Sequence, residues 1–310
     1  MLSAMARKLR VEYPGAMYHV MNRGDRREPI FWDDQDRNRF LETLGEACAK
    51  ADWQVHAYCL MGNHFHLVLE TPHGNLVAGM KWFLGTYTSR FNRRHKLFGH
   101  LFSGRYKALI VDGSGTGYLR TVCDNVHLNP VRAGLLSGQQ ALRAYPWSSY
   151  GEYLKPPGRR PGWLRVDRLL GEMRIPKDTG AGRRQFERLM EERRLAKNPG
   201  QWKQIRRGWF LGEESFRAEL LEQMQEHLGA HHGGSERVET AMAKAERLLA
   251  EELERQGLGE GELAKRRKAD RKKQEIAQRL RSETTMTWAW IASHLQMGTA
   301  GYAANSLRQR

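Results

Sequence analysis

The pair Gly62-Asn63 constrains the fold most, because it is a tight-turn signal that lies between two apolar runs. Short turns of this composition join antiparallel strands when apolar runs flank them. We therefore expect residues 53–61 and 64–71 to be adjacent strands of one sheet. Residues 16–24 alternate apolar and polar side chains and end at a glycine, which predicts a further strand.

Helical patterns separate these strands. Residues 33–51 begin with acidic residues and then repeat apolar ones at helical spacing, and residues 75–95 predict a second amphipathic helix. Residues 105–112 predict a fourth strand, and residues 117–129 predict a third helix that Pro130 closes. The order β-α-β-β-α-β-α predicts an α+β fold, namely a ferredoxin-like split βαβ sheet with one added helix.

The chain changes character after this region. The Pro- and Gly-rich residues 155–162 predict a linker between a first domain, residues 1–154, and a mostly helical basic region, residues 163–283. Residues 284–310 predict two short helices that are broken at Met297-Gly298. This is the layout of a helix-turn-helix, whose second helix enters the major groove, although a plain helical hairpin has the same pattern. The outward residues of the second helix are Tyr302, Asn305, Arg308 and Arg310.

The charge balance indicates a polyanionic partner. Fifty-one Lys and Arg residues against 35 Asp and Glu residues give a formal charge of +16 and a pI near 10.0. Nucleic acid is favoured over an anionic membrane, and a lineage with basic proteins is the alternative. Residues 265–273 are a dense basic run, which suits either a solvated helix face or an arm that contacts phosphates.

The cysteines and the apolar segments indicate the compartment. Cys48, Cys59 and Cys123 are odd in number and widely spaced, so neither a disulfide framework nor a thiolate zinc site is expected. The N-terminus lacks an apolar core of signal-peptide length, and no stretch approaches the roughly 20 apolar residues that span a bilayer. We therefore expect a cytoplasmic protein without a membrane partner.

His64-Phe65-His66 is the sharpest local feature. Residues i and i+2 of a strand point to the same face, so the two imidazoles project together. Two adjacent imidazoles can bind a divalent ion, although paired strand histidines often serve packing alone. Asn129, at the end of the third predicted helix, is a candidate oxygen ligand. Such a set leaves positions on Mg²⁺ or Mn²⁺ open for phosphate oxygens.

The stretch LMGNHFHLVLET resembles the His-hydrophobic-His motif of HUH single-strand nucleases. Together with residues 13–24, 99–112 and 126–136, it resembles the REP-associated tyrosine transposases, which are one-tyrosine HUH enzymes. The resemblance covers roughly residues 5–150. The helical tail is similar to that of longer members, which carry a DNA-binding end like that of replication initiators.

This resemblance implies a catalytic domain with a ferredoxin-like fold that acts on single-stranded or hairpin DNA. It implies an Mg²⁺ or Mn²⁺ cofactor at His64 and His66, with Asn129 as the candidate third ligand. In the family, a helix tyrosine attacks a DNA phosphate and keeps the 5′-phosphate covalently. The released 3′-OH later attacks to rejoin strands.

The family tyrosine stands four residues before the asparagine, so one helical turn places both on the same face. In this chain that position holds Asn125, whose carboxamide cannot act as the nucleophile. Tyr118 lies about 10.5 Å away along the helix axis, and Tyr106 lies on a strand. Packing suits both tyrosines better than attack. Hydrolysis by water activated on the metal is the remaining route.

Basic and aromatic residues around this motif are candidates for contacts with DNA. Trp82, Phe102 and Tyr106 are available for base stacking. The backbone-binding candidates include Arg26, Arg27, Arg90, Arg93, Arg94 and Lys96. The residues expected to bind DNA are Arg23, Arg105, Tyr106, Lys107, Arg132, Tyr302, Asn305 and Arg308.

Three functions remain open. The first is a working transposase-type single-strand endonuclease with strand-transfer activity, which Asn125 is expected to impair. The second is a catalytically inactive DNA-binding protein that keeps the metal ligands. The third is a transcriptional regulator that binds duplex DNA through the C-terminal helix-turn-helix.

Overall fold

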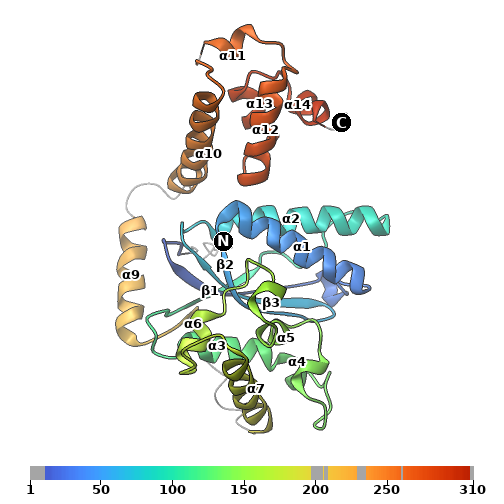
Figure 1. Ribbon diagram of the computed structural model, residues 1–310, viewed down its shortest axis with the longest axis vertical. Coiled ribbons are helices and arrows are strands. Elements are labelled where there is room, and N and C mark those ends of the chain that lie inside the picture. The colour runs from blue at the N-terminus through green and yellow to red at the C-terminus, as the bar shows by residue number, and fades with distance from the viewer. Residues whose placement is uncertain (1–10, 197–204, 206–208, 229–234, 260, 308–310) are drawn as a thin grey trace, which may run out of the picture.

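A computed structural model describes residues 11–196, 205, 209–228, 235–259 and 261–307. Figure 1 shows a sheet with helices on both faces and a separate helical bundle next to one of these helical layers. The described side chains form two hydrophobic cores, one within residues 16–220 and one within residues 245–303. The predicted α+β class is confirmed, with helices dominating the C-terminal half.

The sheet has five strands in the order β2-β3-β1-β4-β5. The predicted hairpin is present as β2 and β3, which pair antiparallel on either side of Gly62-Asn63. A fifth strand, β5, adds to the edge parallel to β4, in a region that the sequence predicts as helical. The strands are β1 (Ala16–Arg23), β2 (Gln54–Leu60), β3 (His64–Thr71), β4 (Lys107–Val111) and β5 (Phe210–Leu211).

Helices α1 (Asp34–Ala51) and α2 (Leu76–His95) cover one face of the sheet, and α3 (Tyr118–His127) covers the other (Figure 1). The aromatic ring of Phe65 on β3 contacts Phe40 of α1 and Phe83 of α2, at centroid distances of 5.0 Å and 6.3 Å. Because side chains alternate along a strand, the residues before and after Phe65 face α3.

Pro130 does not close the third helix as the sequence predicts. Leu128 keeps helical backbone angles, and the chain continues directly into α4 (Asn129–Arg132). Proline lacks an N–H donor and is tolerated in the first turn of a helix. The residues on either side of Pro130 therefore stay in one nearly continuous helical path.

Residues 155–162 are packed against the first domain rather than forming an extended linker. Arg160 donates to Glu152 O at 2.9 Å and forms an ion pair with Asp178. Leu164 bridges to Val55 of β2, and the main core continues to Leu220. The elements of this part are α5 (Tyr150–Tyr153), α6 (Asp167–Glu172), α7 (Gly180–Leu195) and α9 (Glu214–Leu228), with 3-10 turns at Asp25–Arg27, Leu142–Ala144 and Pro157–Arg159.

The C-terminal bundle has its own core, which includes Ile276, Ile291 and Leu295. Two short helices flank Met297-Gly298 as expected, and the Thr299 side chain caps the second by accepting from Tyr302 N. Within the basic run, Lys273 is fully buried and donates to two backbone carbonyl oxygens, so this run is not one exposed face. The helices are α10 (Ser235–Arg255), α11 (Glu262–Lys265), α12 (Arg271–Glu283), α13 (Trp288–His294) and α14 (Ala300–Ser306).

Lysine side chains join the bundle to the first domain. Lys50, near the end of α1, donates to the carbonyl oxygens of Arg281 and Ser282 at the end of α12. Lys244 of α10 donates to Lys50 O at 3.1 Å and to Asp52 Oδ2 at 3.0 Å. The bundle therefore contacts the C-terminal end of α1.

Two general expectations concern the cysteines and the membrane. Cys48, Cys59 and Cys123 are all buried and unbridged. Across the described ranges, no helix combines the length and the apolar character that crossing a bilayer requires.

Candidate phosphate and metal site

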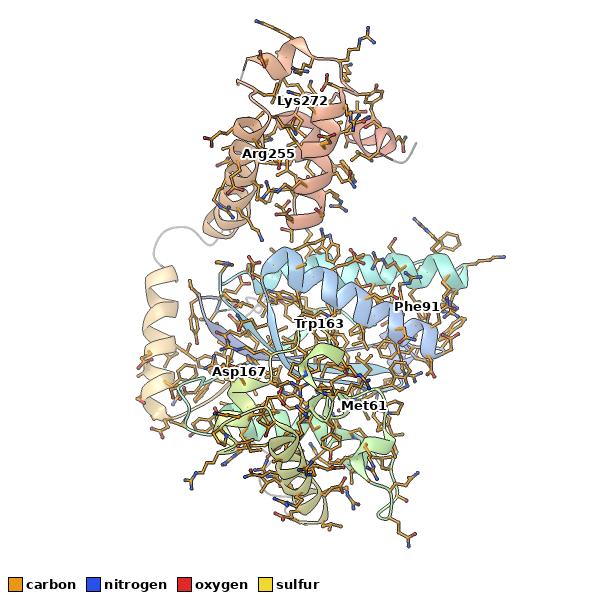
Figure 2. The ribbon with its side chains drawn as sticks, viewed as in Figure 1. Met61, Phe91, Trp163, Asp167, Arg255 and Lys272 are labelled. Carbon is orange, nitrogen blue, oxygen red and sulfur yellow. The ribbon has the colours of Figure 1, made fainter. Side chains whose placement is uncertain are left out.

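The register of β1 and β3 places the motif histidines of β3 beside Met21 and Arg23 of β1. Met21 pairs with His66, and Arg23 pairs with His64, so these four side chains share the face that α3 covers. The rings of His64 and His66 lie 5.2 Å apart. Figure 2 shows the side chains that fill the space between the sheet and its helical layers.

A cavity of about 360 Å³ opens on this face between the strands and α3. It contains Asn125, Asn129 and His66, three of the four residues predicted for the active site. We call this cavity the β1–α3 pocket. His64 stands beside it, while Arg105 and Tyr106 are not among the lining residues. The lining residues are His19, Met21, Arg23, His66, Lys107, Ala108, Leu109, Asn125, Asn129, Arg132 and Ile205.

Asn125 and Asn129 lie one helical turn apart, which places both on the pocket side of the helical path. Asn125 is 4% exposed, and Asn129 is partly buried. None of the described lining residues carries a hydroxyl or a thiol. Tyr118 is only partly buried and packs against the core, whereas Tyr106 is 8% exposed. The described pocket wall therefore presents amides and imidazoles but no tyrosine.

Asn63 fixes the protonated nitrogen of His64. The Asn63 Nδ2 donates to Arg27 O at 2.9 Å, so its Oδ1 faces His64 Nδ1 at 2.7 Å. An amide oxygen only accepts hydrogen bonds, so the proton of the neutral ring must be on Nδ1. His64 therefore keeps a lone pair on Nε2, which is the form that binds a metal. Sequence reasoning treated Asn63 only as a turn residue.

His19 makes the corresponding contact to His66 and was missed by sequence reasoning. Its Nε2 lies 3.0 Å from His66 Nδ1, and the two rings stack at 5.2 Å. His19 is 1% exposed, and its Nδ1 has no hydrogen-bond partner among the described residues. When His66 Nδ1 donates this hydrogen bond, its Nε2 carries the lone pair. The alternation of residues 16–24 places His19 on one face, but only the strand register identifies His66 as its neighbour.

The pocket is electropositive, yet its imidazoles are neutral at neutral pH. Burial, aided by Arg23, lowers the pKa of His64 to about 4. Burial lowers the pKa of His66 well below its usual value, and His19, His64, Arg132 and Arg23 lower it further. Arg23, Lys107 and Arg132 line the pocket, and no carboxylate does so among the described residues. This charge pattern favours an anion such as a phosphate.

The described residues contain no group of three or more His, Cys, Asp or Glu side chains that could hold a metal ion. The predicted set of two imidazoles and one amide oxygen is a weaker metal-binding group than three such side chains would be. His66 and Asn129 share the pocket, and the lone pair on His64 Nε2 makes its ring a suitable ligand. Because Mg²⁺ and Mn²⁺ prefer oxygen ligands, either ion would need phosphate oxygens to supply most of its ligands here.

Comparison with known proteins adds one family match, which covers part of the chain. Residues 12–123 match the IS200-like transposase family. This IS200-like region runs from just before β1 into α3 and ends two residues before Asn125. The chain is also similar to a solved structure described as that of the REP-associated tyrosine transposase bound to a REP hairpin. The two are 14% identical, with a TM-score of 0.41, over 53% of this chain and 90% of that chain. No curated protein matches the chain.

Residues beyond the IS200-like region hold α3 in place. The carboxylate oxygens of Asp124 both lie 2.7 Å from Arg193 Nη1 of α7. Three residues later on the same face of α3, the buried His127 contacts Ser149 Oγ at 2.8 Å. Burial raises the pKa of Asp124 to about 6, although Arg193 acts in the opposite direction. Asp124 therefore depends on Arg193 to remain ionised.

Arg193→Gln is expected to destabilise the protein more than Asp124→Asn. The first change leaves a buried carboxylate without its cation and costs about 3 kcal/mol of unfolding free energy at about pH 9, where that carboxylate is ionised. The second leaves a guanidinium that is 28% exposed and can turn to water, at a cost of about 1 kcal/mol. Urea unfolding of the two variants measures both values.

The same experiment has a pH dependence of known sign. The pKa of Asp124 is higher in the folded state, so folding retains a proton that the unfolded chain releases between about pH 4 and pH 6. Loss of Arg193 raises the folded pKa of Asp124 further, so both proteins carry a neutral Asp124 at acidic pH and differ only where the unchanged chain is ionised. The deficit of Arg193→Gln should therefore shrink on acidification. Equal losses in the two variants, or a deficit that is constant with pH, would contradict this account.

Proposed function

We propose that the chain is a transposase-type protein that binds single-stranded or hairpin DNA and whose tyrosine-dependent cleavage is impaired by Asn125. The observation that carries the proposal is the composition of the β1–α3 pocket. It combines three cations and two asparagines with a motif histidine, and it lacks carboxylates and hydroxyl groups among its described residues. Such a wall suits a DNA phosphate but provides no nucleophile to attack it.

The fold supports this proposal. The strand order β4-β1-β3-β2, with α1 and α2 on one face, is the arrangement expected of a ferredoxin-like split βαβ sheet. We propose this class for the sheet, with α3 as the added helix and β5 as an edge addition. Both motif histidines then lie on the face opposite α1 and α2. Asn125 of α3 lies on this same face.

Arg23, Lys107 and Arg132 are the proposed phosphate contacts. Their charges attract a polyanion without reading its sequence, so binding should weaken as salt is added. Arg105 is exposed, lies two residues before the lining residue Lys107 and is a further candidate. The buried Tyr106 offers little ring surface to a base, so we do not include it in the proposed stacking contacts.

We propose that His64, His66 and Asn129 hold Mg²⁺ or Mn²⁺. When bound, the ion would polarise the scissile phosphate. The chain itself supplies two neutral imidazoles, one amide oxygen and a positive surrounding field. Because that field repels a free divalent cation, the ion should bind more tightly when a phosphate is present. The neighbouring residues Asn63 and His19 orient the two imidazoles.

Asn125 occupies the position from which the family tyrosine attacks. A carboxamide cannot form a phosphotyrosine link, but its N–H groups can donate hydrogen bonds to a phosphate oxygen. Its 4% exposure, within the pocket wall, suits this binding role. A working endonuclease that uses another nucleophile is the second candidate.

A cleavage assay separates these two candidates. Incubation with hairpin-containing single-stranded DNA and Mn²⁺ should give no covalent protein–DNA band on a denaturing gel. Asn125→Tyr should produce this band, because it places a phenol one helical turn before Asn129.

Two controls sharpen the assay. Asn125→Phe adds the ring without the hydroxyl, and Asn125→Tyr combined with His66→Ala removes a proposed ligand. Neither should produce a band. A covalent band from the unchanged chain would contradict the proposal that Asn125 impairs cleavage, and it would favour a working transposase.

Asn63→Leu should weaken Mn²⁺ binding about tenfold to hundredfold, because His64 would lose the acceptor that holds its proton on Nδ1. Asn63→Asp is the matched control, since it keeps an oxygen acceptor and should bind close to the unchanged chain. Calorimetric titration of Mn²⁺ in the presence of the hairpin DNA measures both affinities. Equal losses in the two variants would reject the orienting role.

We also propose that α13 and α14 form a helix-turn-helix that contacts duplex DNA, which would suit a regulatory function. Tyr302 is 47% exposed on α14, and Asn305 is exposed one turn later. Arg308 and Arg310, the other predicted contacts, lie outside the described residues. The N-cap at Thr299 and the turn at Gly298 support this arrangement.

Tyr302→Ala combined with Asn305→Ala should weaken duplex binding about tenfold and leave hairpin binding unchanged. Point variants suit this test better than deletion of residues 284–310, because that segment supplies part of the second core. Band-shift titration with both DNA forms measures the effect. An unchanged affinity for the duplex would reject the regulatory role of this surface.

A further inference from the structure

Exposed aromatic side chains gather where α2 ends. Phe98 is 98% exposed and Trp32 is 56% exposed, and Leu97 beside them is 39% exposed. Among the described residues, the only other exposed aromatic side chain of this size is Tyr302, in the C-terminal bundle. The aromatics that the sequence suggested for stacking differ, since Phe102 and Tyr106 are each 8% exposed.

Ring contacts position Trp32, and a hydrogen bond holds the backbone next to Phe98. The Trp32 ring lies 4.1 Å from the His95 ring and 5.6 Å from the Phe91 ring, by centroids. The Asn92 side chain restrains the segment that carries Phe98, because the Nδ2 of Asn92 donates a hydrogen bond to Gly99 O at 3.0 Å. Because these contacts already position the Trp32 ring, it loses little conformational entropy when a planar ligand stacks on it.

The surface lies at the same end of the sheet as His64. Helix α2 starts at the opposite end and has 20 residues, so it extends about 30 Å and reaches the end where β3 begins. Backbone bonds connect the segments there, including Gly24 N to Asn63 O at 2.9 Å and Asp25 N to Leu101 O at 2.9 Å. Met61 of the hairpin and Phe91 of α2 both lie on the right of Figure 2.

The charges around the rings suit a polyanion. Arg94 and His95 contact the nearby carboxylates Asp33 and Asp36, which leaves other cations available. In the described part of the chain, four cations near the rings form no ion pair, whereas only two nearby carboxylates form none. The cations are Arg26, Arg27, Arg93 and Lys96, and the carboxylates are Asp25 and Glu28.

We infer that Trp32 and Phe98 form a stacking platform for unpaired bases of a DNA strand whose phosphate occupies the β1–α3 pocket. The inference rests on the proposed binding of single-stranded DNA and adds the place where its bases bind. Every base has an aromatic face, so the platform accepts any sequence. Arg93 and Lys96 at its rim then contact the backbone of the same strand.

Binding of a labelled oligodeoxythymidylate tests the platform. Phe98→Ala and Trp32→Ala should each weaken binding about tenfold, while Trp32→Phe should remain close to the unchanged chain. The salt dependence should stay the same in these variants, because no charge is lost. Arg93→Gln with Lys96→Gln should instead reduce the slope by about 0.7 for each lost phosphate contact.

Two controls distinguish stacking from structural damage. Leu195→Ala removes another exposed apolar side chain, on α7, and should leave DNA binding unchanged. A strand that contains 2-aminopurine should lose fluorescence on binding the unchanged chain but lose less on binding Phe98→Ala, because the signal reports stacking. Thermal unfolding should be the same for Phe98→Ala and the unchanged chain, since this side chain is almost fully exposed.

The outcomes separate this inference from the proposed function. When the unchanged chain binds the strand and both alanine variants bind equally well, the platform is rejected and the proposed function stands. When the unchanged chain binds no single strand at low salt, both fail. When Phe98→Ala instead dissociates an oligomer and keeps its DNA affinity, a second copy of the chain is the occupant and the inference is overturned.

Discussion

The antiparallel register between β1 and β3 is the constraint on which the site depends. It pairs Met21 with His66 and Arg23 with His64, and it brings the buried His19 within 3.0 Å of His66. A slip of one residue would turn the histidines toward the helices α1 and α2 and would expose the Phe65 face to α3. Aromatic packing of Phe65 against Phe40 and Phe83 opposes such a slip. The hydrophobic core on one face of the sheet therefore fixes the polar chemistry on the other.

Burial and positive charge act together in the pocket. Both lower the affinity of the imidazoles for protons, so His64 and His66 keep their lone pairs at neutral pH. The same cations attract a phosphate and oppose the entry of a lone divalent ion. Under the proposed function, phosphate and metal would therefore bind cooperatively in a pocket that has no carboxylate among its described lining residues. Outside the IS200-like region, the Asp124–Arg193 pair holds the helix that carries Asn125.

Much of this arrangement follows from short-range sequence patterns. Strand alternation predicts that His64 and His66 share a face, and helical periodicity predicts that Asn125 and Asn129 do so. Other features depend on distant parts of the chain. The orienting contacts of His19 require the strand register, and β5 adds to the sheet from a region that has helical composition. Aromatic residues look alike in sequence, yet Phe98 is exposed whereas Phe102, four residues later, is in the core.

The sequence by itself determined the order of the helices and strands from β1 to α3, the HUH-like motif and the absence of a tyrosine at position 125. These are local properties, since backbone geometry sets the periods of helices and strands and residue identity sets the available chemistry. The tertiary structure alone decided which side chains surround the motif, which aromatics are exposed and where residues 155–220 pack. Burial and register depend on contacts between segments that are far apart in the chain, and no local pattern encodes those distances.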